Sequence, residues 1–119
     1  MNIVIVGIGK VGSTVTEYLA QDGHDVVVVD KSPQVVEHAI TTYDVMGICG
    51  NGAAPEVLKE ADVAHADLVI ALTSSDEFNI LCCIISKKNG ARHAIARVRN
   101  PEYAEKLVLM RDELGLSMT

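Results

Sequence analysis

A glycine-rich turn near the start of the chain has the residue types and spacing that bind a dinucleotide. Gly7, Gly9 and Gly12 form a Gly-x-Gly-x-x-Gly motif directly after an apolar run, and Asp30 closes the next apolar run, 18 positions after Gly12. The first glycine permits a tight turn, the second lets the backbone approach a pyrophosphate, and the third lets a helix pack against a sheet. Asp30 can accept hydrogen bonds from both hydroxyls of an adenosine ribose. The pattern therefore predicts an adenine-nucleotide site.

The residues between these glycines belong to the same predicted site. Ile8, Lys10 and Val11 lead into a helix, whose first N–H groups and positive dipole end attract phosphate. Lys10 points either to solvent or back to a terminal phosphate, where it would favour a triphosphate over a dinucleotide. Its charge also suits long-range attraction of either ligand, so Lys10 leaves that choice open.

Short apolar runs alternate with helix-like segments along the whole chain. Strands are expected at residues 2–6, 26–29, 45–49, 68–72 and 93–98, and helices at 10–21, from Ser32 and Pro33 onward, at 55–60, from a Ser74 cap to Asn89, and at 100–115. This alternation predicts an α/β fold: a Rossmann-like, doubly wound parallel sheet with strand order 3-2-1-4-5-6.

Length and composition fit one such domain. Hydrophobic residues make up 49% of the 119 residues but aromatic residues only 3%, so the core is expected to be aliphatic, as suits a parallel sheet buried on both faces. Residues 116–119 resemble the start of a sixth strand that the sequence cuts short. We therefore expect residues 1–119 to be a single Rossmann domain from a longer protein.

The charge balance excludes several partners. A net charge of −6 argues against nucleic acid, which needs a basic stripe, and against an anionic lipid surface. No apolar stretch approaches the ~20 residues that span a bilayer, and a strand beginning by residue 3 leaves no room for a signal peptide. We therefore expect a cytoplasmic domain without direct membrane insertion.

The three cysteines lack the spacing of a metal or redox site. Cys82 and Cys83 are neighbours, Cys49 is distant, and no Cys-x-x-Cys or Cys/His ligand pattern occurs. No metal site is expected, and all three cysteines are predicted to be small buried hydrophobic residues.

Two further loops should face the ligand, because open α/β sheets bind ligands over the carboxyl ends of their strands where the strand order reverses. Asn51 and Gly52 follow the third strand, where the amide could hydrogen-bond an adenine edge or simply form an ordinary turn. Thr73 and Ser74 follow the fourth strand and could contact a ribose or phosphate, while Ser74 also caps the next helix. Both sets are predicted to bind the cofactor.

Two arginines near the end of the fifth strand are the remaining candidates. Alternation places Arg97 and Arg99 on one face of that strand. Arg97 is predicted to reach the second phosphate or ribose across the crevice, with a surface salt bridge as the alternative. Arg99 is the weaker candidate.

No catalytic set accompanies the predicted crevice. A dehydrogenase needs a proton donor or acceptor near the nicotinamide, but no Tyr-x-x-x-Lys pair occurs and no histidine falls in these loops. Asp76 and Glu77 are interpreted as favourable first-turn helix charges. The chain is therefore predicted to be non-enzymatic. The alternative is the cofactor-binding half of an NAD-dependent oxidoreductase whose catalytic domain lies elsewhere.

Two stretches closely resemble one family: DLVIALTSSDEFN, from Asp67 to Asn79, and ARVRNPEY, from Ala96 to Tyr103. They are similar to the N-terminal nucleotide-binding domains of peripheral Trk potassium-uptake subunits, also called TrkA-N, RCK or KTN domains. The resemblance covers essentially the whole chain.

The resemblance implies a cytosolic sensor that binds NAD(H) or ATP/ADP and regulates a membrane-embedded potassium translocation subunit. It implies dimers or rings formed through the helix after the fifth strand, which carries Tyr103, Leu107 and Met110, and a second, smaller domain after this one. The nucleotide contacts it implies fall on Gly7 to Val11, Asp30, Asn51 with Gly52, Thr73 with Ser74, and Arg97.

The type of nucleotide is only partly determined. Asp30 would repel a 2′-phosphate, so NADP is not expected. NAD and ATP both carry an adenosine with free ribose hydroxyls, and Asp30 does not separate them.

Overall fold

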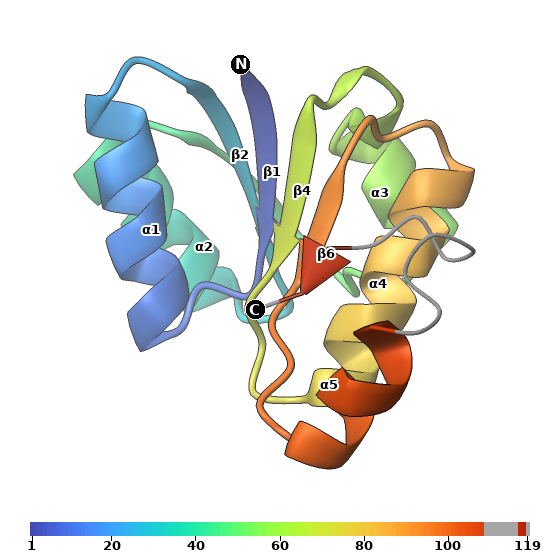
Figure 1. Cartoon of the computed structure of the whole chain (residues 1–119). Helices are drawn as coiled ribbons and strands as arrows, with labels where there is room; N and C mark the ends of the chain where they lie inside the picture. The colour runs from blue at the N-terminus through green and yellow to red at the C-terminus, as the bar shows by residue number, and fades with distance from the viewer. Residues whose placement is uncertain (109–116, 119) are drawn as a thin grey trace.

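A computed structural model describes residues 1–108 and 117–118. Its centre is a parallel sheet of order β3-β2-β1-β4-β5-β6, which confirms the predicted doubly wound α/β fold (Figure 1). The central strand β1 pairs on one side with β2, Ile3 opposite Val26, and on the other with β4, Ile3 opposite Leu68. This reversal of strand order opens a crevice at the carboxyl ends of the strands.

Most elements begin and end close to their expected positions. The strands are β1 (Asn2–Val6), β2 (Asp25–Asp30), β3 (Met46–Cys49), β4 (Leu68–Ala71), β5 (Ala94–Ala96) and β6 (Ser117–Met118). The helices are α1 (Lys10–Gln21), α2 (Pro33–Tyr43), α3 (Pro55–Glu60), α4 (Asp76–Lys88) and α5 (Pro101–Val108), with a 3-10 turn at Val63–His65.

Two expectations about these elements were wrong. β5 spans three residues rather than the six expected, so Arg97 and Arg99 lie beyond the strand. The cap of α4 is Ser75, not Ser74: the Ser75 hydroxyl accepts the Phe78 N–H at 3.1 Å. Both serines fit a capping pattern, and the loop conformation decides between them.

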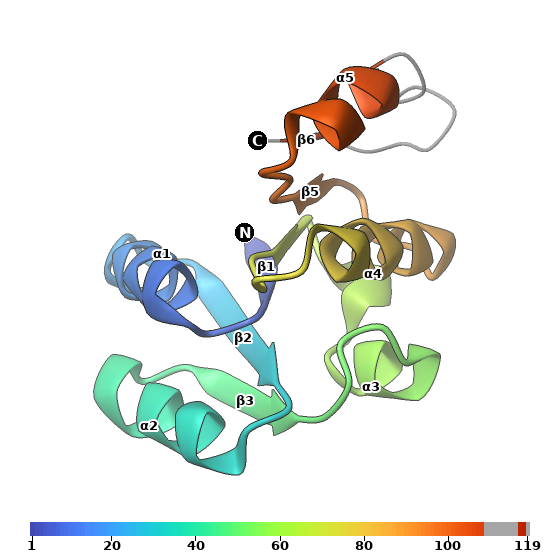
Figure 2. The same ribbon diagram turned by 90° about the horizontal axis from the view of Figure 1, so that it is seen from below.

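Helices cover both faces of the sheet. Figure 2 shows α1 and α2 on one face and α3 and α4 on the other. Alternate residues of β1 supply the two cores: Ile3 and Ile5 pack towards α1 and α2, whereas Val4 and Val6 pack in the cluster that contains Leu58 of α3. No helix among the described residues is long and apolar enough to cross a membrane.

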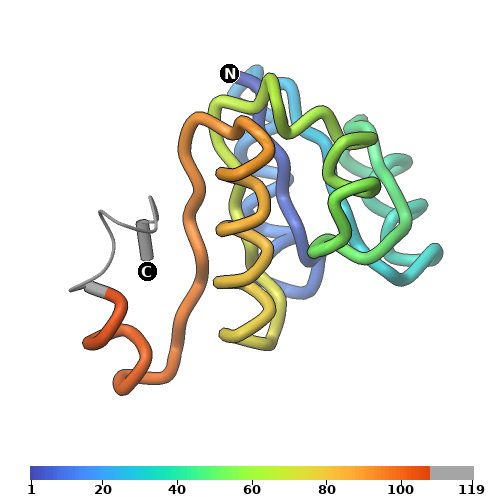
Figure 3. The backbone as a smooth tube through the Cα atoms, turned by 90° about the vertical axis from the view of Figure 1, so that its right-hand side faces the viewer, coloured from blue at the N-terminus to red at the C-terminus, as the bar shows by residue number. Residues whose placement is uncertain are grey.

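In Figure 3 the segment after β5, drawn in orange, runs alongside α4 and leads to α5, drawn in red-orange at the lower left. Tyr103 and Leu107 of α5 are half-buried and pack against the core cluster on the α4 side of the sheet. Met110 and the expected end of this helix lie outside the described residues.

The cysteines fall into two classes. Cys82 and Cys83 on α4 are fully buried, as predicted, but Cys49 at the end of β3 is exposed, so the prediction was wrong for Cys49. Burial raises the pKa of the Cys82 thiol to about 11, and burial together with the neighbouring Cys82 raises the pKa of Cys83 further. Thiolates, the reactive form, are therefore scarce at the two buried positions.

Iodoacetamide should consequently alkylate one cysteine in the native protein and three in denaturant. Cys49 should react at neutral pH, whereas Cys82 and Cys83 should react only after unfolding. Mass spectrometry of quenched samples counts the adducts. Rapid alkylation of Cys82 or Cys83 in the native protein would contradict the burial of these two side chains.

Candidate nucleotide-binding crevice

A cavity of about 580 Å³ lies over the carboxyl ends of the strands. Residues from four separate loops line it: Val6, Gly7 and Gly9; Val29, Asp30 and Lys31; Gly50, Asn51 and Gly52; and Leu72, Thr73, Ser74, Ser75 and Phe78. The strand-order argument selected these loops, and the structure brings them together in one cavity.

The three glycines meet different packing demands. Gly7 has φ +94°, a left-handed conformation, and a Cβ there would lie 2.8 Å from the Thr73 backbone nitrogen. A Cβ on Gly12 would overlap the carbonyl oxygen of Gly7. A Cβ on Gly9 would meet no atom within 4 Å, because Gly9 faces the crevice. Two glycines therefore serve the fold, and Gly9 leaves room for a ligand.

The N-terminus of α1 offers hydrogen-bond donors at this turn. Its cap residue is Gly9, which supplies no side-chain cap. The first N–H groups of a helix have no acceptor within the helix. In the described part of the chain, no oxygen accepts a hydrogen bond from the backbone N–H groups of Lys10 and Val11. This end of α1 is thus suited to an anionic group. The exposed side chains of Lys10 and Val11 and the buried Ile8 do not line the cavity itself.

Asp30 is held firmly at the end of β2. The Ile8 N–H donates to its Oδ2 at 2.8 Å, and the Ser32 N–H donates to its Oδ1 at 2.9 Å. The carboxylate therefore joins the glycine turn to the start of α2, and each oxygen keeps capacity for another donor. This geometry fixes the carboxylate where it lines the cavity.

Asn51 and Gly52 form the wall beyond β3. The Asn51 Oδ1 accepts the Ala53 N–H at 2.9 Å, which is the turn-forming role considered from the sequence. Gly52 packs so closely on Val6 that a Cβ would overlap that side chain. Asn51 both shapes the loop and lines the cavity.

Thr73 is fixed by a buried asparagine on α4. The Asn79 Oδ1 accepts the Thr73 N–H at 2.9 Å and the Thr73 hydroxyl at 2.6 Å. The Asn79 Nδ2 donates to the Thr73 carbonyl at 3.0 Å and to the Arg97 carbonyl at 2.9 Å. With 0% exposure, Asn79 uses both donors and both acceptor positions within the protein. It therefore sets the wall that Thr73 and Ser74 present to the cavity.

The arginines take other positions than expected. Arg97 is half-buried and absent from the cavity lining, while its N–H donates to the Ala71 carbonyl. Arg99 instead reaches the cavity loop, donating from Nη2 to the Ser74 carbonyl at 2.9 Å. Alternation could not place either side chain, because the strand ends before them.

Seven lining residues lie outside the set predicted from the sequence: Val6, Val29, Lys31, Gly50, Leu72, Ser75 and Phe78. Lys31 and Gly50 are direct neighbours of predicted residues, so their position beside Asp30 and Asn51 was the available signal. Phe78 is the only phenylalanine of the chain and lies one turn into α4. A helical pattern alone assigns such a residue to the core.

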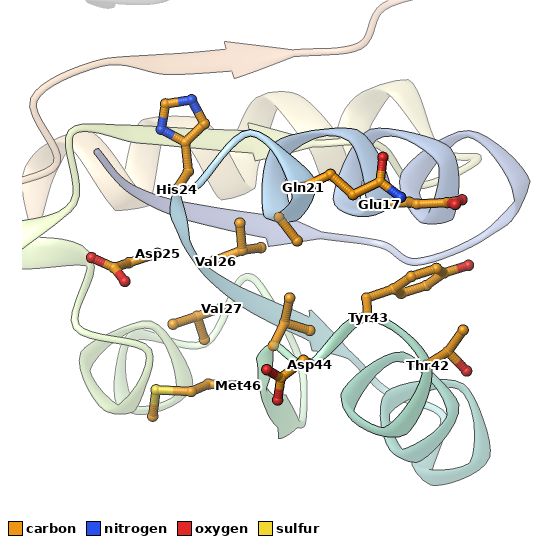
Figure 4. A pocket seen from close by; sticks show the side chains of 12 residues that line it. Glu17, Gln21, His24, Asp25, Val26, Val27, Thr42, Tyr43, Asp44 and Met46 are labelled. Atoms are coloured by element: carbon orange, nitrogen blue, oxygen red, sulfur yellow. The ribbon is translucent and has the colours of Figure 1, made fainter.

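A second hollow, of about 520 Å³, lies at the opposite, amino end of β2 and β3 (Figure 4). It adjoins the C-terminal ends of α1 and α2, which carry no basic residue in their last turns. Glu17, Asp25 and Asp44 add negative charge to the lining. Helix C-termini and carboxylates repel phosphate, so the crevice at the glycine turn is the candidate nucleotide site.

The sequence matches a family profile and resembles named potassium-uptake proteins. The TrkA-N domain is the family whose sequence profile matches, over residues 3–113. A Trk system potassium uptake protein TrkA homolog from Methanothermobacter thermautotrophicus is 39% identical over 105 residues, covering 88% of this chain and 49% of the relative. One from Archaeoglobus fulgidus is 40% identical over 115 residues, covering 97% and 26%. The chain spans half or less of the length of these relatives.

The fold also resembles part of a solved channel structure. The GsuK channel bound to NAD matches with a TM-score of 0.82 at 27% identity, over 99% of this chain and 21% of that one. The curated relatives are named for potassium uptake and not for a reaction, in agreement with the prediction of a non-enzymatic protein.

Proposed function

Because the chain belongs to the TrkA-N domain family, we propose that it is the nucleotide-binding regulatory domain of a potassium uptake system. The observation that carries this proposal is the crevice at the glycine turn. There the N-terminus of α1 is uncapped by any side chain, Gly9 leaves open space, and a fixed Asp30 carboxylate lies at the edge. Phosphate donors beside a ribose acceptor suit an adenine nucleotide.

NAD(H) is the ligand that the crevice fits better, with ATP or ADP as the alternative. The lining extends to both sides of the glycine turn, from Asn51 beyond β3 to Phe78 at α4. A dinucleotide has a second nucleoside to occupy the Thr73 side, whereas ATP has only phosphates to place there. The related GsuK channel was solved with NAD.

We further propose that the domain acts at the cytoplasmic face of the membrane, through a membrane-embedded translocation subunit that it regulates as a dimer or ring. The half-buried Tyr103 and Leu107 place α5 at the surface, as such an assembly requires. A ligand shifts gating only by its difference in affinity for two assembly states. A tenfold effect needs about 1.4 kcal/mol of difference.

An oxidoreductase is the second candidate, and the crevice lining disfavours it. Within the described residues, no histidine, tyrosine or cysteine lines the cavity, and its two charged side chains, Asp30 and Lys31, both follow from the end of β2, on the side expected to hold the adenosine ribose and not the nicotinamide. Hydride transfer to a substrate needs a proton donor or acceptor there. Turnover of NADH by the full-length protein would reverse this preference.

Calorimetric titration with NADH, NAD, ATP, ADP and NADPH tests the proposal. NADH should bind most tightly and NADPH weakly. Asp30→Ala should weaken NADH binding by about tenfold or more, since hydrogen bonds to a charged group are worth about 1.5–3 kcal/mol. Asp25→Ala is the matched control, because it removes an exposed carboxylate from the other end of β2 and should leave the affinity unchanged.

Two outcomes would overturn parts of this proposal. Tighter binding of ATP than NADH would replace a redox-linked sensor by an energy-charge sensor. If no nucleotide binds more tightly than ~1 mM, about −4 kcal/mol, the crevice is not a nucleotide site in this domain. Thermal unfolding of both variants separates lost contacts from lost fold.

A further inference from the structure

The loop that closes one side of the crevice is bonded to the segment that leads into α5. This crevice loop comprises residues 72–75, and the segment comprises residues 97–100. One bond comes from the segment's side chain: the Arg99 Nη2 donates to the Ser74 carbonyl at 2.9 Å. Ser74 lines the cavity, so a side chain from beyond β5 reaches the back of the crevice wall.

Asp76 makes the reverse contact. The Arg99 N–H donates to its Oδ1 at 3.0 Å, and the Asn100 N–H donates to its Oδ2 at 2.8 Å. These two N–H groups hold the pKa of the Asp76 carboxyl below its usual value, so it remains ionised across the physiological range. Asp76 is the first residue of α4, one position after the Ser75 cap. It therefore moves with the end of the crevice loop.

The segment is in turn continuous with α5. The Asn100 carbonyl accepts the Ala104 N–H at 3.1 Å, and its side-chain Oδ1 accepts the Glu102 N–H at 3.0 Å. Asn100 thus caps the first turn of α5. Asn100, one of the two residues whose N–H groups bind Asp76, therefore also sets the start of that helix.

A helix cap alone does not account for these bonds. A first-turn carboxylate stabilises its own helix through the dipole whatever its further partners, yet both oxygens of Asp76 bind a segment about 23 residues away in sequence. Glu77 provides a second first-turn charge to α4. The specific geometry of Asp76 and Arg99 serves the connection between the crevice loop and α5.

We propose that Asp76 and Arg99 are positioning residues that couple the crevice loop to α5, so that a nucleotide bound against Thr73 and Ser74 stabilises the first turns of α5. This proposal rests on the proposed nucleotide-binding function. A ligand that fixes the Ser74 carbonyl fixes the acceptor of Arg99, and the Asp76 bonds pass that restraint to Asn100. Two sites are coupled when both of them influence the conformation of one shared structural element, here the segment of residues 97–100.

Hydrogen exchange of the full chain with and without saturating NADH tests the coupling. In the wild type, NADH should slow exchange both in the glycine turn, residues 7–12, and in residues 101–108 of α5. The expected slowing in α5 is about fivefold or more, the lower end of typical couplings between sites. In Asp76→Ala and in Arg99→Gln, NADH should still protect the glycine turn but should no longer protect α5.

Matched controls separate this role from general destabilisation. Glu56→Ala removes a first-turn carboxylate from α3, and Arg92→Gln removes an arginine whose side chain makes no hydrogen bond within the described residues. Both should keep the NADH-dependent protection of α5. A merely structural role for Asp76 would raise exchange equally with and without NADH, leaving the ratio unchanged.

The outcomes distinguish the inference from the proposed function. Protection of the glycine turn without protection of α5 in the wild type would overturn the coupling alone. Unchanged NADH-dependent protection of α5 in Asp76→Ala and Arg99→Gln would also overturn it. If NADH protects neither region, the proposed nucleotide binding fails and the coupling fails with it.

Discussion

Asn79→Ala is expected to lower the free energy of unfolding by about 3–5 kcal/mol, since the change strands several buried groups and leaves a cavity. The Asn79 side chain is fully buried and makes four hydrogen bonds: three to the N–H, hydroxyl and carbonyl groups of Thr73, and one to the Arg97 carbonyl. Alanine would leave the Thr73 N–H and the Arg97 carbonyl without partners in the protein interior. Denaturant unfolding followed by circular dichroism measures the loss.

Asn89→Ala is the matched control on the same helix. Asn89 is exposed at the end of α4 and donates one bond, to the Ile85 carbonyl at 2.8 Å. Its loss should cost about 1 kcal/mol or less. Equal costs for Asn79→Ala and Asn89→Ala would show that the buried network does not hold the β4–α4 loop.

Gly12→Ala and Gly9→Ala should differ strongly in their effect on stability although the two glycines lie only three residues apart. A Cβ on Gly12 overlaps the Gly7 carbonyl, a backbone atom that cannot rotate away, so Gly12→Ala should destabilise the fold by about 3 kcal/mol. A Cβ on Gly9 meets nothing, so Gly9→Ala should change stability by about 1 kcal/mol or less, the cost of a poorer helix cap.

Binding should show the complementary result. The methyl group of Gly9→Ala would occupy the space in which a pyrophosphate approaches the backbone, so we expect this stable variant to lose NADH affinity by about tenfold or more, roughly 1.4 kcal/mol. Calorimetric titration beside thermal unfolding checks both parts. Full NADH affinity in Gly9→Ala would place the phosphates elsewhere in the crevice.

The sequence predicted the sheet and half of the crevice because those features depend on local patterns. β1, α1 and α3 have the expected boundaries, since each has an apolar run or a terminal glycine or proline that marks its ends. Gly7, Gly9 and Asp30 line the cavity because the glycine turn and the end of β2 both lie at the carboxyl edge of the sheet, where the strand order reverses. The predicted contacts of all these residues with a nucleotide stay predictions.

Features that depend on contacts between distant segments could not be read from local patterns. Ser74 and Ser75 are equally good caps in isolation, and the bond from Arg99 to the Ser74 carbonyl helps to fix the loop that selects Ser75. Cys49 was expected to be buried on composition alone, but it lies at the end of a strand on the edge of the sheet. Arg97 was assigned to a strand that stops one residue earlier.

The strand order also has a consequence for synthesis on the ribosome. β1 is made before both of its neighbours, and its second neighbour arrives only when Leu68, the partner of Ile3, has been translated. At a translation rate of about 5–20 residues per second, the time between the synthesis of β1 and that of β4 is on the order of seconds. During it, one row of backbone donors and acceptors on β1 has no strand to pair with, although these residues are among the most apolar in the chain. Nascent-chain length, rather than the intrinsic speed of sheet formation, therefore sets the earliest moment at which this domain can close its core.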